Sequence, residues 1–145
     1  MDVNIYVDST IKNPQRGEGI AMYLLECIIK DEPKTIEEHI CLPDTTEDAA
    51  ILTALIEALG RVRDPAKTKV KLFVRAQGVY NAISSGRIQA SKIDRFKNAK
   101  GKPVKNAELW SILLTTVMRY HWTITDKEHS YEQYMRGELK KWQDR

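Results

Sequence analysis

The chain has 145 residues, of which 42% are hydrophobic and 30% are charged, and its formal net charge is +3 at pH 7. This length suits a single domain over residues 1–145, which would bury roughly two thirds of its unfolded surface. The sequence has neither a run of ~18 apolar residues nor a signal peptide, so we expect a soluble, cytoplasmic protein without a membrane partner. Cys27 and Cys41 match no metal-binding spacing, and we expect both to be small buried residues in strands.

The first part of the chain predicts three antiparallel strands. Apolar residues alternate with polar ones from Val3 to Val7, which places Asp8 at the carboxyl end of the first strand, on its second face. Polar turns over 12–19 and 30–34 separate this strand from apolar segments over 20–29 and 35–42. Because sites in α/β sheets form at the carboxyl ends of strands, Asp8 is the first candidate site residue.

A helix is predicted next, with a strand after it. The sequence Thr45-Thr46-Glu47-Asp48 matches a capping box with Thr45 as N-cap. Apolar residues then recur at helical spacing, namely Leu52, Leu55, Ile56, Leu59 and Val62. The apolar run over 70–74 predicts a buried strand, so a right-handed crossover would place it parallel to an earlier strand. A short helix is expected over 77–83.

The segment from 87 to 105 is basic. It contains a single acid, Asp94, and the following cations: Arg87, Lys92, Arg95, Lys97, Lys100, Lys102 and Lys105. Phe96 lies among these charges, and Trp110 follows them. Such a surface favours phosphate binding with a strong salt dependence. The alternative is a solvated, lysine-rich loop.

The remaining residues predict a helix over 106–120, a strand over 121–125 and a last helix that begins with a capping box at Ser130. The apolar stripe of this last helix consists of Tyr131, Tyr134, Met135, Leu139 and Trp142. We interpret the isolated histidines His121 and His129 as structural. The predicted fold class is therefore α/β, with three antiparallel strands followed by strands that alternate with helices.

Three short motifs carry a family resemblance. They are Ile5 to Thr10 followed by Asn13-Pro14, the helical run Ile56-Glu57-Ala58-Leu59, and Lys102 to Asn106 followed by Leu109-Trp110. Because these motifs occur in this order, the chain resembles ribonuclease H of type 1 over nearly its whole length. The resemblance implies a mixed five-stranded sheet with helices on both faces. It also implies four carboxylates that bind two magnesium ions about 4 Å apart, for cleavage of the RNA strand of RNA/DNA hybrids.

By this resemblance, only one of the four carboxylate positions still holds an acid. Asp8 is retained, whereas Ile51, Arg75 and Gly137 occupy the other three positions. Magnesium requires clustered negative charge, so we expect no metal site beyond Asp8 and no cofactor. We hypothesise that the Arg75 guanidinium pairs with Asp8 and occupies the vacated metal position.

A rebuilt site is the alternative, in which relocated carboxylates bind Mg²⁺ or Mn²⁺. The candidates are Glu47, Asp126, Glu128, Glu132 and Glu138. Each has an ordinary explanation as well, because acids are common in the first turn of a helix and on its solvated face.

The resemblance also implies nucleic-acid contacts. Asn13, Thr46 and Gln77 stand at positions that resemble polar contact sites of the family, whereas Glu47 and Asp48 would repel phosphate there. The basic segment aligns with a basic protrusion of the family that grips the DNA strand. Its expected contact residues are Lys92, Arg95, Lys97, Lys100, Lys102 and Lys105.

Three functions are compatible with these observations. The first is a catalytically degenerate ribonuclease H-like domain that binds an RNA/DNA hybrid or duplex RNA without cleaving it. The second is a metal-dependent endoribonuclease with relocated carboxylates. The third is a protein-interaction module on the same fold, since a fold does not determine function. Metal-dependent cleavage identifies the second, and affinity for nucleic acid separates the first from the third.

Overall fold

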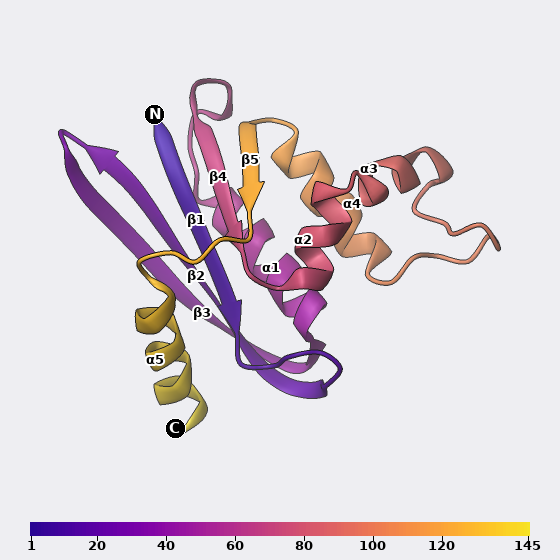
Figure 1. Ribbon diagram of the computed structural model, residues 1–145, viewed down its shortest axis with the longest axis horizontal. Coiled ribbons are helices and arrows are strands. Elements are labelled where there is room, and N and C mark those ends of the chain that lie inside the picture. The colour runs from indigo at the N-terminus through magenta and orange to yellow at the C-terminus, as the bar shows by residue number, and fades with distance from the viewer.

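The computed structural model describes residues 1–145, except for the side chain of Ile93. Its five strands are β1 (Asp2–Ser9), β2 (Arg16–Ile29), β3 (Glu32–Thr46), β4 (Lys69–Val74) and β5 (His121–Thr125). They form one sheet in the order β3-β2-β1-β4-β5 (Figure 1). The β1–β2 and β2–β3 pairs are antiparallel, and the β1–β4 and β4–β5 pairs are parallel. The predicted mixed sheet is confirmed.

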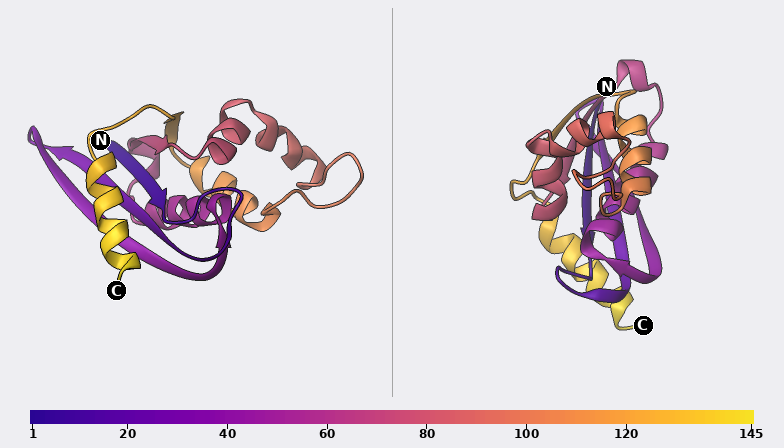
Figure 2. Two further views of the ribbon diagram at one scale, coloured as in Figure 1. Left: turned by 60° about the horizontal axis from the view of Figure 1, so that its bottom comes forward. Right: turned by 90° about the vertical axis from the view of Figure 1, so that its right-hand side faces the viewer.

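Helices cover both faces of this sheet. They are α1 (Glu47–Gly60), α2 (Gln77–Ser84), α3 (Arg87–Ser91), α4 (Ala107–Val117) and α5 (Glu132–Gln143), with 3-10 turns η1 (Pro65–Lys67) and η2 (Lys92–Asp94). Helix α1 packs on the sheet and against α4, whereas α5 packs on β1 and β2. Figure 2 shows α5 apart from the group formed by the other helices.

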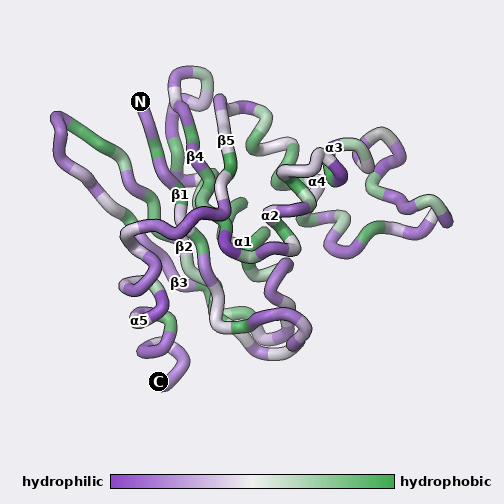
Figure 3. Tube along the Cα trace, in the orientation of Figure 1, coloured by the Kyte–Doolittle hydropathy of each residue, from purple (hydrophilic) through white to green (hydrophobic). Residues whose placement is uncertain are grey.

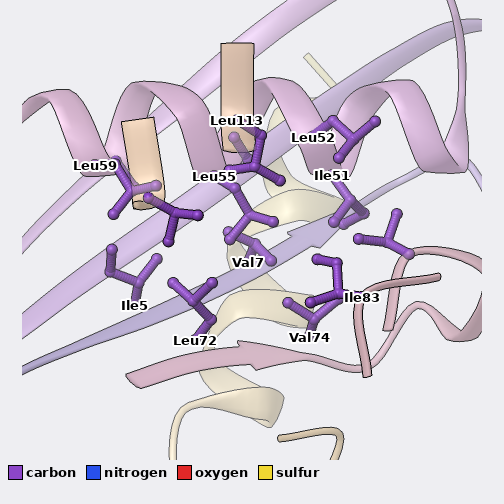
Figure 4. Packing of buried hydrophobic residues seen from close by; sticks show 14 of the residues in the cluster. Ile5, Val7, Ile51, Leu52, Leu55, Leu59, Leu72, Val74, Ile83 and Leu113 are labelled. Carbon is purple, nitrogen blue, oxygen red and sulfur yellow. The ribbon is translucent and has the colours of Figure 1, made fainter. Parts of the chain in front are cut away.

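Alternation along β1 divides the apolar residues between two cores. Val3, Ile5 and Val7 belong to the main core under α1, whereas Tyr6 belongs to a smaller core under α5. In the main core, apolar side chains of α1 meet those of β1 and β4 (Figure 4). Hydrophobic segments therefore follow the strands and α1, while the connection between α3 and α4 is mostly hydrophilic (Figure 3). This division leaves Asp8 on the face that α5 covers.

Two predicted helix caps are wrong. Thr46, not Thr45, is the N-cap of α1, and its hydroxyl accepts a hydrogen bond from the Ala49 amide at 3.3 Å. The reason is that β3 continues to Thr46, which pairs with Arg16. Helix α5 begins after Tyr131 without a side-chain cap, so Ser130 has no capping role.

The cysteines are less buried than we expected. Cys27 is half-buried, and Cys41 is exposed. Cys41 lies on β3, which is an edge strand of the sheet and has a neighbour on one side only. The sequence pattern cannot distinguish an edge strand from a central one, which is why this prediction failed for Cys41.

We predict that Ile51→Ala lowers the free energy of unfolding by about 2–5 kcal/mol, because it leaves a cavity in the main core. The Ile51 side chain is 2% exposed, whereas Ile112 on α4 is 43% exposed. The matched control Ile112→Ala should change stability by less than about 0.5 kcal/mol. Urea unfolding of both variants measures the difference, and equal losses would contradict the packing described for Ile51.

Candidate functional site

The parallel pairing of β1 with β4 brings two strand ends together. Val7 and Val74 form the last pair between these strands, so Asp8 and Arg75, which follow them, lie at the same edge of the sheet. The Oδ1 atom of Asp8 accepts hydrogen bonds from the Ser9 amide at 2.8 Å and from the Lys12 ammonium at 2.6 Å. The ammonium also lies 3.9 Å from Oε2 of Glu47. One lysine therefore neutralises Asp8 and approaches a second carboxylate.

The hypothesis that Arg75 pairs with Asp8 is wrong. The Nε atom of Arg75 lies 2.8 Å from Oε1 of Glu132 on α5, and its guanidinium also donates to the main-chain oxygen of Asp126. Two features explain the difference. Lys12 lies in the turn that follows β1 and already occupies the Asp8 carboxylate. Glu132 has a side chain that is only 19% exposed, so burial favours pairing it with a cation.

A cleft of about 400 Å³ opens at this edge, between the end of β1, Arg75 and one side of α5. The connection from β5 crosses the face of the sheet to reach α5 (Figure 1). Four cations line the cleft, namely Lys12, Arg75, Arg136 and Lys140. Three carboxylates line it as well, namely Asp8, Glu132 and Asp144. The cleft is therefore rich in charge, with cations in excess.

The residues at this edge do not fit a magnesium ion, which requires clustered and available carboxylates. Ile51 is packed in the main core, and Gly137 is exposed and does not line the cleft. Asp8 and Glu132 are already paired with cations. Within the described part of the chain, no group of three or more histidine, cysteine, aspartate or glutamate residues is arranged to hold a metal ion.

Most candidates for relocated ligands are engaged elsewhere. Asp126 accepts a hydrogen bond from Gln77 at 3.1 Å, and Glu138 lies 3.3 Å from Lys141. Glu128 is exposed and outside the cleft. Of these candidates, only Glu132 lines the same cleft as Asp8, so the structure does not gather the relocated acids into one site.

His129 is a packing residue at the rim of this site. Its ring lies over Tyr6, with ring centroids 4.4 Å apart, and its Nδ1 atom accepts a hydrogen bond from the Tyr131 amide at 3.2 Å. Burial lowers the pKa of His129, against the opposing effect of nearby Glu132. The imidazole is therefore neutral near pH 7, in agreement with the structural role predicted for it.

Half-buried polar contacts hold the start of α5 against the sheet. The Tyr131 hydroxyl donates to Oε2 of Glu26 on β2, and Asn4 donates to Oε1 of Glu26 at 3.0 Å. Although burial raises the pKa of Glu26, the hydrogen bonds from Tyr131, Asn4 and Tyr6 outweigh it and lower the pKa overall. Glu26 is thus an ionised anchor, and it fixes the wall of the cleft that α5 provides.

The three predicted polar contact residues make internal contacts. Asn13 lies 3.4 Å from Oδ1 of Asp48, Thr46 caps α1, and Gln77 bonds to Asp126. Thr46 and Gln77 lie at the starts of α1 and α2, and Asn13 lies in the turn after β1. Their side chains are used to join the loop after β1, the start of α1 and the loop after β5.

The part of the basic segment between α3 and α4 forms a projection (Figure 1). Asn98 organises its tip, because its side-chain oxygen accepts hydrogen bonds from the amides of Lys100 at 2.9 Å and Lys102 at 3.1 Å. A bridge between Lys97 and Pro103 closes the turn. Four exposed cations share this tip, namely Arg95, Lys97, Lys100 and Lys102. Among the described side chains, none of the four has an ion pair.

Other residues of the basic segment lie elsewhere. Arg87 and Lys105 line a separate cleft of about 190 Å³, together with Asp48. The Lys92 ammonium lies 3.4 Å from the sulfur of Met118. The structure therefore brings together only part of the predicted contact set.

The aromatic residues of this region do not offer a stacking surface. Phe96 is 8% exposed and Trp110 is 5% exposed, and both belong to the main core. The interpretation of Phe96 as an aromatic residue interleaved with charges on the surface is therefore wrong. The buried Phe96 ring anchors the projection to the main core. A second contact is the hydrogen bond that the Val104 amide donates to the Phe96 carbonyl at 2.8 Å.

Sequence reasoning missed three cations of the cleft, namely Lys12, Arg136 and Lys140. A signal was present in the spacing for two of them, because Arg136 and Lys140 follow Glu132 at intervals of four on one helix. Lys12 lies in a turn, where such spacing predicts no contact. This spacing places Glu132, Arg136 and Lys140 on one side of α5, which is the side that faces the strand ends.

Comparisons with known proteins agree with this fold. A sequence model of the RNase H family matches residues 1–126. The chain is similar to the Ribonuclease H of Clostridium botulinum, with 29% identity over 134 residues that cover 91% of this chain and 87% of that protein.

Solved structures show the same architecture. LC9-RNase H1, a type 1 RNase H with the type 2 active-site motif, matches with a TM-score of 0.74 and 17% identity, over 97% of this chain and 71% of that one. The foamy viral protease-reverse transcriptase in complex with an RNA/DNA hybrid matches with a TM-score of 0.70 and 14% identity, over 95% of this chain and 18% of that one. Because the family model covers most of its length, this chain belongs to the RNase H family.

Proposed function

We propose that this protein binds nucleic acid, either an RNA/DNA hybrid or duplex RNA, without cleaving it. The observation that carries the proposal is a pair of salt bridges at the carboxyl edge of the sheet. Lys12 pairs with Asp8 there, and Arg75 pairs with Glu132. A pair of divalent ions would have to displace both cations. The edge of the sheet is thus unsuited to two-metal phosphodiester cleavage.

The basic projection supports the binding half of this proposal. Its four clustered cations form a positive surface outside the cleft, suited to the phosphate backbone. A neighbour in fold, the foamy viral enzyme, is known in complex with an RNA/DNA hybrid. Phosphate contacts of this kind recognise the shape and charge of a duplex and are independent of its sequence.

A second candidate function is metal-dependent cleavage of the RNA strand of hybrids. One observation favours it: the single Lys12 ammonium lies 2.6 Å from Asp8 and 3.9 Å from Glu47, so one cation can reach both carboxylates. Mn²⁺ or Mg²⁺ in the place of that ammonium would have two carboxylate ligands. Glu132 would have to leave Arg75 to provide a third.

We expect no cleavage of a labelled RNA/DNA hybrid by the wild-type protein in Mg²⁺ or in Mn²⁺, beyond the level seen with Asp8→Asn. The reason is that Lys12 occupies Asp8 and also approaches Glu47, while Glu132 is paired with Arg75. Both proteins are purified identically, so that a contaminating nuclease appears equally in the two samples. Metal-dependent cleavage by the wild type alone would establish the second candidate and contradict the first.

Reversing three charges on the projection should weaken hybrid binding. Lys97→Glu, Lys100→Glu and Lys102→Glu together are expected to lower affinity by at least roughly tenfold at moderate salt, and to reduce the salt dependence of binding. Fluorescence anisotropy measured over a salt series gives both values. The three lysines are exposed, so the fold should be unaffected.

The matched control reverses the same number of charges far from the projection, through Lys34→Glu, Lys67→Glu and Lys69→Glu. These residues are also exposed. Lys34 lies near the start of β3, Lys67 in η1 and Lys69 at the start of β4. The control should retain nearly all affinity. Equal losses in the two triple variants would show that net charge alone determines binding, and unchanged affinity in both would remove the projection as a binding surface.

A further inference from the structure

Helix α5 presents a charged stripe to the cleft at the sheet edge. Glu132, Arg136 and Lys140 are spaced four residues apart, which places them above one another on one side of a helix. All three line the cleft of about 400 Å³. Met135 and Leu139 fix the position of α5, because they pack into the smaller core and are only 1% and 4% exposed.

The charges of this cleft do not cancel. Lys12 pairs with Asp8, and Arg75 pairs with Glu132, which removes two cations and two carboxylates. Arg136 and Lys140 remain, and in the part of the chain that the structure describes neither has an ion pair. Asp144 is the one other carboxylate among the described lining residues. The remaining charge is positive.

The walls of the cleft strengthen its attraction for an anion. Val7, Met135 and Leu139 form part of its lining, and these side chains limit the access of water on one side. A guanidinium and an ammonium that face the same space can bind one phosphate group, with arginine as a two-pronged donor and lysine as a point charge. A divalent cation in the same place would meet uncompensated positive charge.

From these observations we infer that the cleft between the ends of β1 and β4 and helix α5 is a phosphate-binding site that operates without a divalent metal, with Arg136 and Lys140 as its principal ligands. The inference rests on the proposed function, since the phosphate is that of a bound nucleic-acid backbone. It extends the binding surface from the basic projection to the edge of the sheet. Hybrid binding should therefore persist in the presence of EDTA.

The test compares two double variants that remove the same charge from the same region. Arg136→Gln with Lys140→Gln changes the cleft, whereas Lys127→Gln with Lys141→Gln changes exposed residues that do not line it. Binding of a short, fluorescently labelled RNA/DNA hybrid is measured in EDTA over a salt series. The cleft variant should lose roughly tenfold or more in affinity and show a shallower salt dependence, while the control variant stays close to the wild type.

A second measurement uses inorganic phosphate as the probe. In NMR titrations of the wild type, phosphate should shift the amide signals of Asp8, Thr10 and the α5 residues around Arg136. The cleft variant should lose these shifts, and its otherwise unchanged spectrum would show that it remains folded. The control variant should keep them.

The outcomes separate this inference from the proposed function. Equal hybrid affinity for the two double variants, together with wild-type binding through the projection, would overturn the cleft site and leave the proposed function intact. Wild-type protein that fails to bind the hybrid but shows the phosphate shifts would support the cleft site and overturn nucleic-acid binding. Hybrid binding that disappears in EDTA would contradict a metal-independent site.

Discussion

The parallel register of β1 against β4 is the constraint on which the site depends. With Val7 opposite Val74, the pairing of the two strands ends at the edge of the sheet where α/β proteins place their ligands. Whatever side chains follow these strands must share one small space. Asp8 and Arg75 follow them here, and each pairs with a partner that comes from outside these two strands.

Those partners come from the turn after β1 and from α5. Lys12 forms an ion pair with Asp8, and Glu132 forms one with Arg75. Both carboxylates are partly buried. A partly exposed pair of this kind contributes only about 1 kcal/mol or less to stability, so the pairs mainly avoid the cost of an isolated buried charge. The fold itself rests on the main core under α1, which contains Ile51 and needs no metal ion. The RNase H fold of this chain therefore does not depend on a metal ion at the edge of the sheet.

Most of the fold, but less of the site, could be predicted from the sequence. Alternation in β1 and helical spacing in α1 are strong local signals, and the bounds of β5 were predicted as the structure has them. The partner of Arg75 was not predictable in this way, because it depends on how α5 returns across the sheet, 57 residues later in the sequence than Arg75. The burial of Phe96 and Trp110 was not predicted, for a similar reason. Composition alone does not show that a basic loop is anchored on the core.

The central claim is that the edge of the sheet repels divalent metal ions. Paramagnetic line broadening by Mn²⁺ in the NMR spectrum tests it most directly, because it reports metal at individual residues without any need for catalysis. We predict no selective broadening of the amides of Asp8, Glu47 and Glu132 as Mn²⁺ is added, beyond that of acids elsewhere on the surface. Saturable broadening confined to these residues would contradict the account and show that the carboxylates release Lys12 and Arg75 to bind metal.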